Sequence, residues 1–421
     1  MGKLGIRKTL AHRSSKRPSL VDKAKAEKDA GRFDEALKLL QRALAGKGRQ
    51  VEVAKYELAL LLSQLGRHEE ADNWLAELGL IWKLNPALLD GSCLVGRKDG
   101  DADRVAAFDN ALPSELLQLL QDAFKPRSTF WTEHKYPTPG FFSYNEPFNQ
   151  ATAKSALPLI QEAAAHAEKL ARANLSSVLS DGKIGSVEWW AHCRPAGSGS
   201  GHQLHYDLDE VGLLKLEEGA LPRHPLISCV IYLSCNSRST PSTTVVTDQT
   251  LRPGSRARRA WVCEPKVNRV LLFDGGLLHG VIPNLSSAPT VTGEAEPRIT
   301  LMLGLWGEPG PCCSPAPSAT ERLGPNMQLP DGAASWPQLL QYAVTTKASE
   351  QMERVQLAGP VQPVWCAVPG ASPMATDVEF IGRWFLNHAP EELQRMARGA
   401  PAIEVEEVSM EELLRLRAAA E

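Results

Sequence analysis

The sequence has no pair of cysteines at the Cys-x-x-Cys spacing that zinc sites and redox motifs use. Its eight cysteines are scattered, so we expect free thiols in a reducing compartment. No segment approaches the roughly 20 apolar residues of a membrane span. No hydrophobic signal core follows Met1 either. These absences argue against a zinc-ribbon protein, a disulfide-rich secreted protein and a membrane protein.

The sequence also lacks an excess of charge of either sign. The formal net charge is -3 over 421 residues, so we expect no attraction of the whole chain to nucleic acid or to an anionic membrane. With 43% hydrophobic residues, the chain can form two or three domains. The predicted location is cytoplasmic. Residues 1–20 are basic and are predicted to be a disordered tail, with an organelle transit peptide as the alternative.

Residues 21–85 contain two similar stretches, "AGRFDEALKLLQRAL" and "LGRHEEADNWLAEL". Their glycines, Gly31 and Gly66, lie 35 residues apart, which resembles the period of the tetratricopeptide repeat. Small residues after each turn, Ala36 and Ala71, would allow close packing of paired helices. Two copies are too few for a free-standing array, so we expect the helices to dock on the next domain or on a partner. An ordinary helical hairpin is the alternative.

Helices are expected at "PSELLQLLQDAF" and over roughly 151–174. Short runs rich in β-branched and aromatic residues follow, such as "SVEWWAHC" and "NRVLLFD", and they predict an all-β core. Residues 105–307 are therefore assigned to one domain. Residues 308–335 are predicted to be a Pro-rich linker. Residues 336–421 are predicted to be a partly helical C-terminal region, with "SMEELLRLRAAA" as the clearest helix.

The stretch "GHQLHYDLDE" offers three candidate pairs of metal ligands. Side chains on one face of a strand repeat every second residue, and His205 and Asp207 meet that spacing. His202 would lie on the opposite face in the same register. Asp209 stands where "DLDE" is expected to turn away. His205 and Asp207 are therefore the favoured pair, although a His-x-Asp pair alone is weak and needs a third ligand.

His279 in "NRVLLFDGGLLHGVIP" offers that third ligand. Two imidazoles and one carboxylate form a facial triad that leaves positions on iron(II) open for exchangeable ligands. Such a site also needs a two-electron donor. On a strand "RITLMLGLW", Arg298 and Thr300 share a face, so a guanidinium and a hydroxyl could together bind a carboxylate. A surface position for Arg298 is the alternative.

The segments "HYD", "LISCVIYLS", "RVLLFDGGLLHGVIP" and "RITLMLGLW" stand in an order that resembles the iron(II)- and 2-oxoglutarate-dependent dioxygenases, within them the prolyl 4-hydroxylase-like group. The resemblance covers residues 109–306. It implies a double-stranded β-helix (jelly-roll) catalytic domain buttressed by helices. The predicted fold class is therefore α+β, with the helical repeat-like region in front of the catalytic domain.

The resemblance also implies roles and cofactors. His205, Asp207 and His279 would bind iron, Arg298 would bind the far carboxylate of 2-oxoglutarate, and Tyr232 would assist it. Thr300 is added from the strand spacing. The implied reaction hydroxylates a peptidyl substrate, prolyl included, or another C–H substrate, and it releases succinate and CO2. The implied cofactors are Fe(II), 2-oxoglutarate as cosubstrate and O2, with ascorbate as a candidate reductant.

Several features depart from the family pattern, and two of them bear directly on the site. His279 and Arg298 lie 19 residues apart, which is longer than usual, because "NLSSAPTVTGEAE" is expected to form an extended hairpin loop. Arg194 precedes Pro195 where related enzymes often have a tyrosine. Arg194 could contact an acidic substrate or 2-oxoglutarate, or form a salt bridge at the surface.

Two other functional readings stay open at this stage. One is a non-catalytic tetratricopeptide-type interaction scaffold with a vestigial β-helix domain. The other is a zinc or manganese barrel with hydrolytic or isomerase chemistry. For the favoured dioxygenase, the helical region could present a peptide or protein substrate. No nucleic-acid or membrane partner is expected, and the sequence does not determine the oligomeric state.

Overall fold

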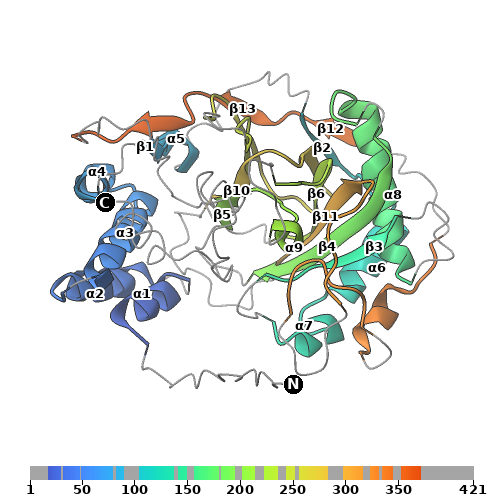
Figure 1. The fold of residues 1–421 in the computed structure, drawn as a ribbon, viewed down its shortest axis with the longest axis horizontal. Coiled ribbons are helices and arrows are strands. Elements are labelled where there is room, and N and C mark those ends of the chain that lie inside the picture. The colour runs from blue at the N-terminus through green and yellow to red at the C-terminus, as the bar shows by residue number, and fades with distance from the viewer. Residues whose placement is uncertain are drawn as a thin grey trace, which may run out of the picture.

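Two antiparallel sheets that face each other form the centre of the protein (Figure 1). The computed structural model describes residues 18–29, 32–47, 49–78, 82–89, 104–136, 141–148, 156–179, 182–194, 202–213, 222–235, 243–251, 256–282, 297–315, 323–330, 334–344 and 352–370. Helices cover the outer faces of both sheets. The α+β prediction is confirmed, and the arrangement is jelly-roll-like.

Within the described residues, the larger sheet has seven strands in the order β12-β2-β9-β6-β11-β4-β3, and the smaller has five in the order β13-β8-β7-β10-β5. The larger sheet comprises β2 (Val105–Asp109), β3 (Tyr144–Pro147), β4 (Ile184–Arg194), β6 (Ile227–Ser234), β9 (Val270–Asp274), β11 (Arg298–Gly307) and β12 (Glu353–Val355). The smaller sheet comprises β5 (His202–His205), β7 (Thr244–Thr247), β8 (Ala260–Cys263), β10 (His279–Val281) and β13 (Ala358–Val361). A separate pair joins β1 (Trp82–Leu84) to β14 (Trp365–Ala367).

The helices fall into an N-terminal group and a group against the larger sheet. The first group is α1 (Leu20–Asp29), α2 (Phe33–Leu44), α3 (Arg49–Gln64), α4 (His68–Glu77) and α5 (Pro86–Leu89). The second group is α6 (Ser114–Ala123), α7 (Thr129–Glu133), α8 (Pro158–Asn174) and the 3-10 helix η3 (Trp336–Leu340). The short α9 (Glu210–Leu213) follows β5, and its Leu213 lies in the apolar cluster of the smaller sheet. The helix expected at "PSELLQLLQDAF" is α6, and the described part of the expected Ala-rich helix is α8. Among the described helices, none is long and apolar enough to cross a membrane.

Strand β11 shows how the larger sheet separates its two faces. Leu301, Leu303 and Leu305 belong to the apolar cluster that the sheet shares with α6 and α8. The alternate residues of the strand point to the other face, between the two sheets, because side chains alternate along a strand. In Figure 1, α8 lies along the outer side of this sheet.

The space between the sheets is filled by apolar side chains from both. Leu271 and Phe273 of β9 and Tyr232 of β6 meet Val246 of β7 and Trp261 of β8 in one cluster. The cluster is mainly apolar, and its polar atoms are the Tyr232 hydroxyl, the Trp261 indole N–H and the Cys263 thiol.

The N-terminal helices pack against the outer face of the smaller sheet. Tyr56 and Leu75 share an apolar cluster with Leu204 and Val245 of that sheet, and Figure 1 shows α1–α4 on this side of the molecule. Ala36 and Ala71, predicted to allow close helix packing, are fully buried between the helices. Docking on the next domain is observed. The identity of the helices as tetratricopeptide repeats stays a prediction.

The described part of the C-terminal region forms mainly strands, where the sequence suggested helices. Strand β12 extends the larger sheet next to β2, β13 extends the smaller sheet next to β8, and β14 pairs with β1. Within the predicted linker, Met327 is buried in the core beside α6 and α8. The expected helix "SMEELLRLRAAA", the basic tail up to residue 17 and the loop "NLSSAPTVTGEAE" lie outside the described residues.

Candidate functional site

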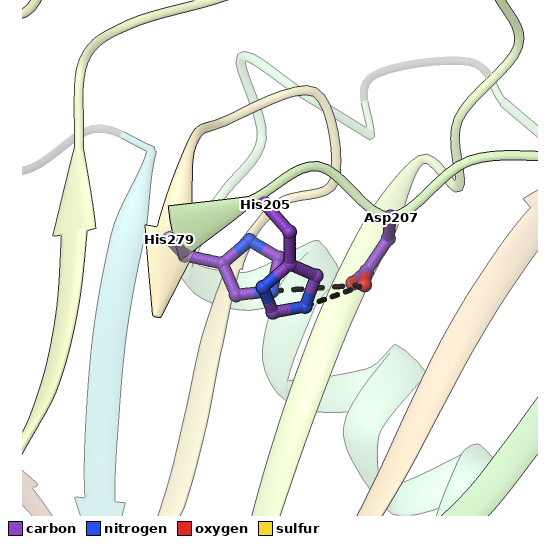
Figure 2. Close-up of side chains that lie close together, drawn as sticks. All are labelled: His205, Asp207 and His279. Atoms are coloured by element: carbon purple, nitrogen blue, oxygen red, sulfur yellow. Dashed lines mark ion pairs between the residues drawn. The ribbon is translucent and has the colours of Figure 1, made fainter. Parts of the chain in front are cut away.

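Three predicted ligands converge at one end of the space between the sheets. His205 ends β5 and pairs directly with His279, which begins β10, so the fold places the two imidazoles side by side. Asp207 lies two residues past the end of β5. One ligand atom from each of His205, Asp207 and His279 lies within 4.8 Å of the others, and Figure 2 shows both rings directed toward the Asp207 carboxylate.

Contacts from outside the triad orient its ligand atoms. The Nδ1 atom of His279 is 3.0 Å from the carbonyl oxygen of Leu277, which fits an N–H donor at Nδ1 and leaves Nε2 free. The hydroxyl of Ser228 donates to Oδ2 of Asp207 at 2.6 Å. The other oxygen, Oδ1, is 3.6 Å from Nε2 of each histidine. Nε2 of both histidines and the Asp207 carboxylate therefore border one small volume.

This donor set fits a divalent transition metal. Two neutral imidazoles and one carboxylate suit iron, and they occupy only part of the coordination sphere of such an ion. On its apolar side, the His279 ring packs against Phe273, with 4.6 Å between the ring centres. The residues present would hold a metal at this position.

The sequence prediction for His202 is corrected by the structure. Strict alternation placed His202 on the face opposite His205, but the centres of the two rings are only 4.7 Å apart. His205 pairs with His279 and His202 pairs with Val281, so β5 advances three residues while β10 advances two. The extra residue is a β-bulge, which returns His202 to the face of His205.

Arg298, Thr300 and Tyr232 lie together on the inner face of the larger sheet. Thr300 pairs directly with Tyr232, and Arg298 lies two residues before it on the same face of β11. The Tyr232 hydroxyl is 2.7 Å from Oγ1 of Thr244 on the facing sheet. Burial lowers the pKa of Arg298, while the neighbouring Tyr232 and Cys235 oppose this shift, so the guanidinium keeps its charge at neutral pH.

A second guanidinium and a buried imidazole flank Arg298. Arg194 pairs with Arg298 across β4 and β11, and His192 pairs with Thr300. Burial lowers the pKa of His192 to about 3, and the charges of Arg194 and Arg298 add to this effect. His192 is therefore neutral, and its Nδ1 is 3.3 Å from the Tyr136 hydroxyl. This end of the site is positively charged.

The opposite end of the same face carries a buried acid that the sequence analysis did not single out. Glu188 is 4% exposed and accepts hydrogen bonds from the Ser143 hydroxyl at 2.6 Å and from the Trp306 indole N–H at 3.1 Å. Burial raises the pKa of Glu188 to about 8, with a smaller contribution from the charges of Asp207 and Glu210. Burial and Asp207 raise the pKa of Glu210 to about 7.

Sequence reasoning missed Ser228 and Glu188 for one reason. Each occupies an inward position of a strand that was expected, and an inward polar residue in an apolar strand was the available signal. Both also pair with Gly304, one from each side. The pairing of these two residues with Gly304 depends on the order of the strands in the sheet, which cannot be predicted from the spacing of the motifs.

The sequence matches no protein-family model and none of the curated proteins compared with it. A Pseudomonas putida prolyl-4-hydroxylase is similar at 14% identity and a TM-score of 0.30, over 48% of this chain and 92% of its own. HygX from Streptomyces hygroscopicus, solved with nickel and 2-oxoglutarate, is 13% identical at a TM-score of 0.29, over 55% and 93%. The non-heme alpha ketoglutarate dependent epimerase SnoN is 13% identical at a TM-score of 0.28, over 52% and 84%. Likenesses this weak carry no argument, so the chemistry inferred below rests on this chain's own side chains.

Proposed function

We propose that this protein is an iron(II)- and 2-oxoglutarate-dependent dioxygenase that hydroxylates a C–H bond of a peptidyl or other organic substrate. The observation that carries the proposal is the convergence of His205, Asp207 and His279, with Nε2 of both histidines 3.6 Å from Oδ1 of Asp207. A scaffold has no physical need for two oriented imidazoles around one carboxylate.

In this proposal, His205, His279 and Asp207 hold the iron. Iron(II) bound there would supply oxygen activation coupled to decarboxylation of 2-oxoglutarate, which yields succinate and CO2. The remaining groups position the reactants. Ser228 fixes the Asp207 carboxylate through its hydrogen bond, and Leu277 fixes the His279 ring. The metal centre thus keeps one arrangement without needing rearrangement during turnover.

The positive end of the site supports binding of 2-oxoglutarate. Arg298 would bind the far carboxylate through its planar pair of N–H donors, and Thr300 and Tyr232 add hydroxyl groups on the same face. The apolar cluster of β7, β8 and β9 walls off this position from water. A hydrolytic zinc or manganese barrel would have no use for a guanidinium held on the inner face of the larger sheet beside two hydroxyl groups.

Succinate formation tests the proposal. Purified protein with iron(II), ascorbate, O2 and 2-oxoglutarate is expected to release succinate without added substrate, since such uncoupled turnover needs only the metal and cosubstrate sites. The His279→Ala variant is expected to lose this activity. The matched control is His166→Ala, because His166 lies on α8 and its Nδ1 is 3.0 Å from the Glu162 carbonyl oxygen.

Anaerobic binding resolves a negative result. If no succinate forms, the titration of iron(II) and 2-oxoglutarate into the protein without O2 separates two explanations. Binding of both that is lost in His279→Ala would support an enzyme that turns over only with its substrate. Absence of binding would contradict the proposal and favour the interaction-scaffold reading.

A further inference from the structure

The triad residue Asp207 lies beyond the end of its strand, so strand pairing alone does not fix its position. Strand β5 ends at His205, and among the described residues its last pair with β10 joins His205 to His279. The two imidazoles are therefore held by paired strands, whereas Asp207 is two residues further along the chain. Ser228 binds the Asp207 carboxylate and does not bind the backbone of this segment. Other contacts have to hold the chain where it leaves the sheet.

Apolar contacts anchor the outer side of the segment. Tyr206 and Leu208 are buried in the cluster between the smaller sheet and the N-terminal helices. The Tyr206 hydroxyl also donates to the carbonyl oxygen of Thr250 at 3.1 Å. Because Tyr206 and Leu208 flank Asp207 in an extended segment, they direct its side chain toward the opposite, inner side. They do not fix the point at which the chain turns into α9.

The carboxylate of Asp209 ties that turn to two other parts of the chain. Asp209 is 2% exposed, and it accepts hydrogen bonds from the backbone N–H groups of Gly212 at 2.8 Å and Cys312 at 3.0 Å. Arg223 adds two contacts. Its carbonyl oxygen accepts from the backbone N–H of Asp209 at 2.9 Å, and its Nη1 lies 3.7 Å from Oδ2 of Asp209. Both the backbone and the side chain of Asp209 are therefore fixed.

The surroundings of the Asp209 carboxylate leave it no room for a ligand. A Cβ atom at Gly212 would lie 2.5 Å from Oδ2 of Asp209, so only glycine at this position leaves the carboxylate in place. Asp209 is also not among the three residues whose ligand atoms converge. Its role in the site is therefore indirect, through the segment that carries Asp207.

We propose that Asp209 is a positioning residue for the metal centre. By tying the chain beyond Asp207 to Cys312 and to α9, it holds the Asp207 carboxylate against the two imidazoles. Hydrogen bonds from backbone N–H groups to a carboxylate are strong, so the segment has one position before a metal binds. This inference rests on the proposed function, because it requires that the triad binds a metal.

Two different substitutions test the inference. Asp209→Asn keeps the shape of the side chain but loses its charge and one acceptor oxygen, and it is expected to weaken binding of manganese(II) by about tenfold. Gly212→Ala keeps the carboxylate but displaces it, because the new Cβ would collide with Oδ2 of Asp209. Its effect is expected to have the same direction. Anaerobic titration followed by the electron paramagnetic resonance of free manganese(II) measures the affinity.

The visible absorption of the cobalt(II)-loaded protein gives a second measurement, because it reports the arrangement of the metal ligands. Its bands are expected to shift in both variants, which a loss of overall stability would not cause. Circular dichroism checks that each variant folds. Gly212→Ala supplies the independent test if Asp209→Asn does not fold.

Asp248→Asn is the matched control. The Asp248 carboxylate also accepts two backbone N–H groups, from Arg258 at 2.7 Å and from Arg259 at 2.9 Å. It also pairs with the Arg259 guanidinium. These contacts tie the connection between β7 and β8 and not the segment that carries Asp207. The affinity for manganese(II) and the cobalt(II) spectrum are therefore expected to stay unchanged.

The outcomes separate this inference from the proposed function. Wild-type affinity and cobalt(II) spectra in both variants, or equal changes in Asp248→Asn, would overturn the inference even if iron-dependent succinate formation is observed. Manganese(II) binding that depends on Asp209, in a protein that forms no succinate, would support the positioning role and contradict the dioxygenase. A wild-type protein without metal binding that depends on His279 would overturn both.

Discussion

Two of the three triad residues, His279 and Asp207, are oriented by a neighbour that is not itself a ligand. Leu277 accepts from His279, and Ser228 donates to Asp207. Such contacts set the tautomer of an imidazole and the rotation of a carboxylate, and their loss commonly lowers metal affinity by roughly 10–100-fold. Single substitutions of residues that contact the ligands are therefore expected to lower metal affinity while leaving the protein folded.

Ser228→Ala is expected to weaken binding of iron(II), or of manganese(II) as a redox-inert substitute, by about tenfold. The Asp207 carboxylate loses its 2.6 Å hydrogen bond and gains rotational freedom. Anaerobic titration measures the affinity. The control is Ser234→Ala on the same strand, because the Ser234 hydroxyl donates to the carbonyl oxygen of Pro297. Equal effects of the two variants would argue against a positioning role for Ser228.

Arg298→Ala is expected to raise the KM for 2-oxoglutarate by about 10–100-fold, because hydrogen bonds to a charged group are worth roughly 1.5–3 kcal/mol. Arg298→Lys should recover part of this loss, since it keeps the charge and loses the planar fork. The rate of succinate formation at varied concentrations of 2-oxoglutarate gives the KM of each variant. Iron(II) affinity serves as the control and should not change. An unchanged KM would remove Arg298 from the cosubstrate site.

Glu188 gives the metal-free protein a pH-dependent stability. Its pKa rises from 4.5 to about 8 on folding, so the folded state binds the proton more tightly than the unfolded state. The free energy of unfolding should therefore fall as the pH rises from about 4.5 to about 8, by up to about 5 kcal/mol from this group. Asp207 and Glu210 face the same volume and couple to this titration.

Urea unfolding of the wild type and of Glu188→Gln at several pH values measures this effect. The glutamine variant has no titrating group at this position. The free energy of unfolding of the variant minus that of the wild type should therefore increase as the pH rises from about 4.5 to about 8. A difference in free energy of unfolding between the two proteins that does not change from pH 5 to pH 8 would contradict the raised pKa of Glu188.

At the scale of elements, the contact between α4 and β1 depends on a buried ion pair. Nζ of Lys83 on β1 lies 2.5 Å from Oδ1 of Asp72 on α4, and both residues are 8% exposed. Strand β1 in turn pairs with β14. One ion pair thus joins the N-terminal helices to a strand pair that includes the C-terminal segment.

Lys83→Met is expected to lower the free energy of unfolding by about 3–5 kcal/mol, because it leaves the Asp72 carboxylate buried without a partner. Adding Asp72→Leu should recover much of the loss, since the unpaired charge is then removed. Urea unfolding measures both. Lys38→Met is the control, because the Lys38–Glu35 pair is exposed and such pairs contribute about 0–1 kcal/mol. A double variant no more stable than Lys83→Met would contradict this account.

At the scale of the whole molecule, the C-terminal segment 352–370 is part of the folded core. It supplies a strand to each sheet and a partner to β1. Its side chains Val361, Val364, Trp365 and Val368 are each at most 4% exposed and lie in the cluster between the smaller sheet and the N-terminal helices. The segment therefore fastens the helices to the sheet.

A chain that ends at residue 344 is expected to unfold at a much lower temperature than one that ends at residue 370, or not to fold cooperatively. Four buried apolar side chains contribute about 6–12 kcal/mol, which is comparable to the whole stability of a typical domain. Scanning calorimetry of the two chains measures the difference. Similar melting temperatures would show that the segment only covers a core that is already complete.

The sequence by itself determined the strands of the larger sheet that carry long apolar runs, such as β6, β9 and β11, and the chemistry of the triad. Periodicity and residue type suffice there, because alternation and imidazole or carboxylate groups are local properties of the chain. It also determined the helical character of the N-terminal region. Short strands such as β5, β8 and β10 left weaker patterns, since three or four residues do not define a period.

Only the tertiary structure decided which residues share a space. The bulge between β5 and β10 returned His202 to the face of His205, and no residue spacing contains that extra step. Glu188 and Ser228 became neighbours of the triad through Gly304, which stands 116 and 76 residues from them. Strand order sets these contacts, because side chains from distant segments meet only after the sheets pair.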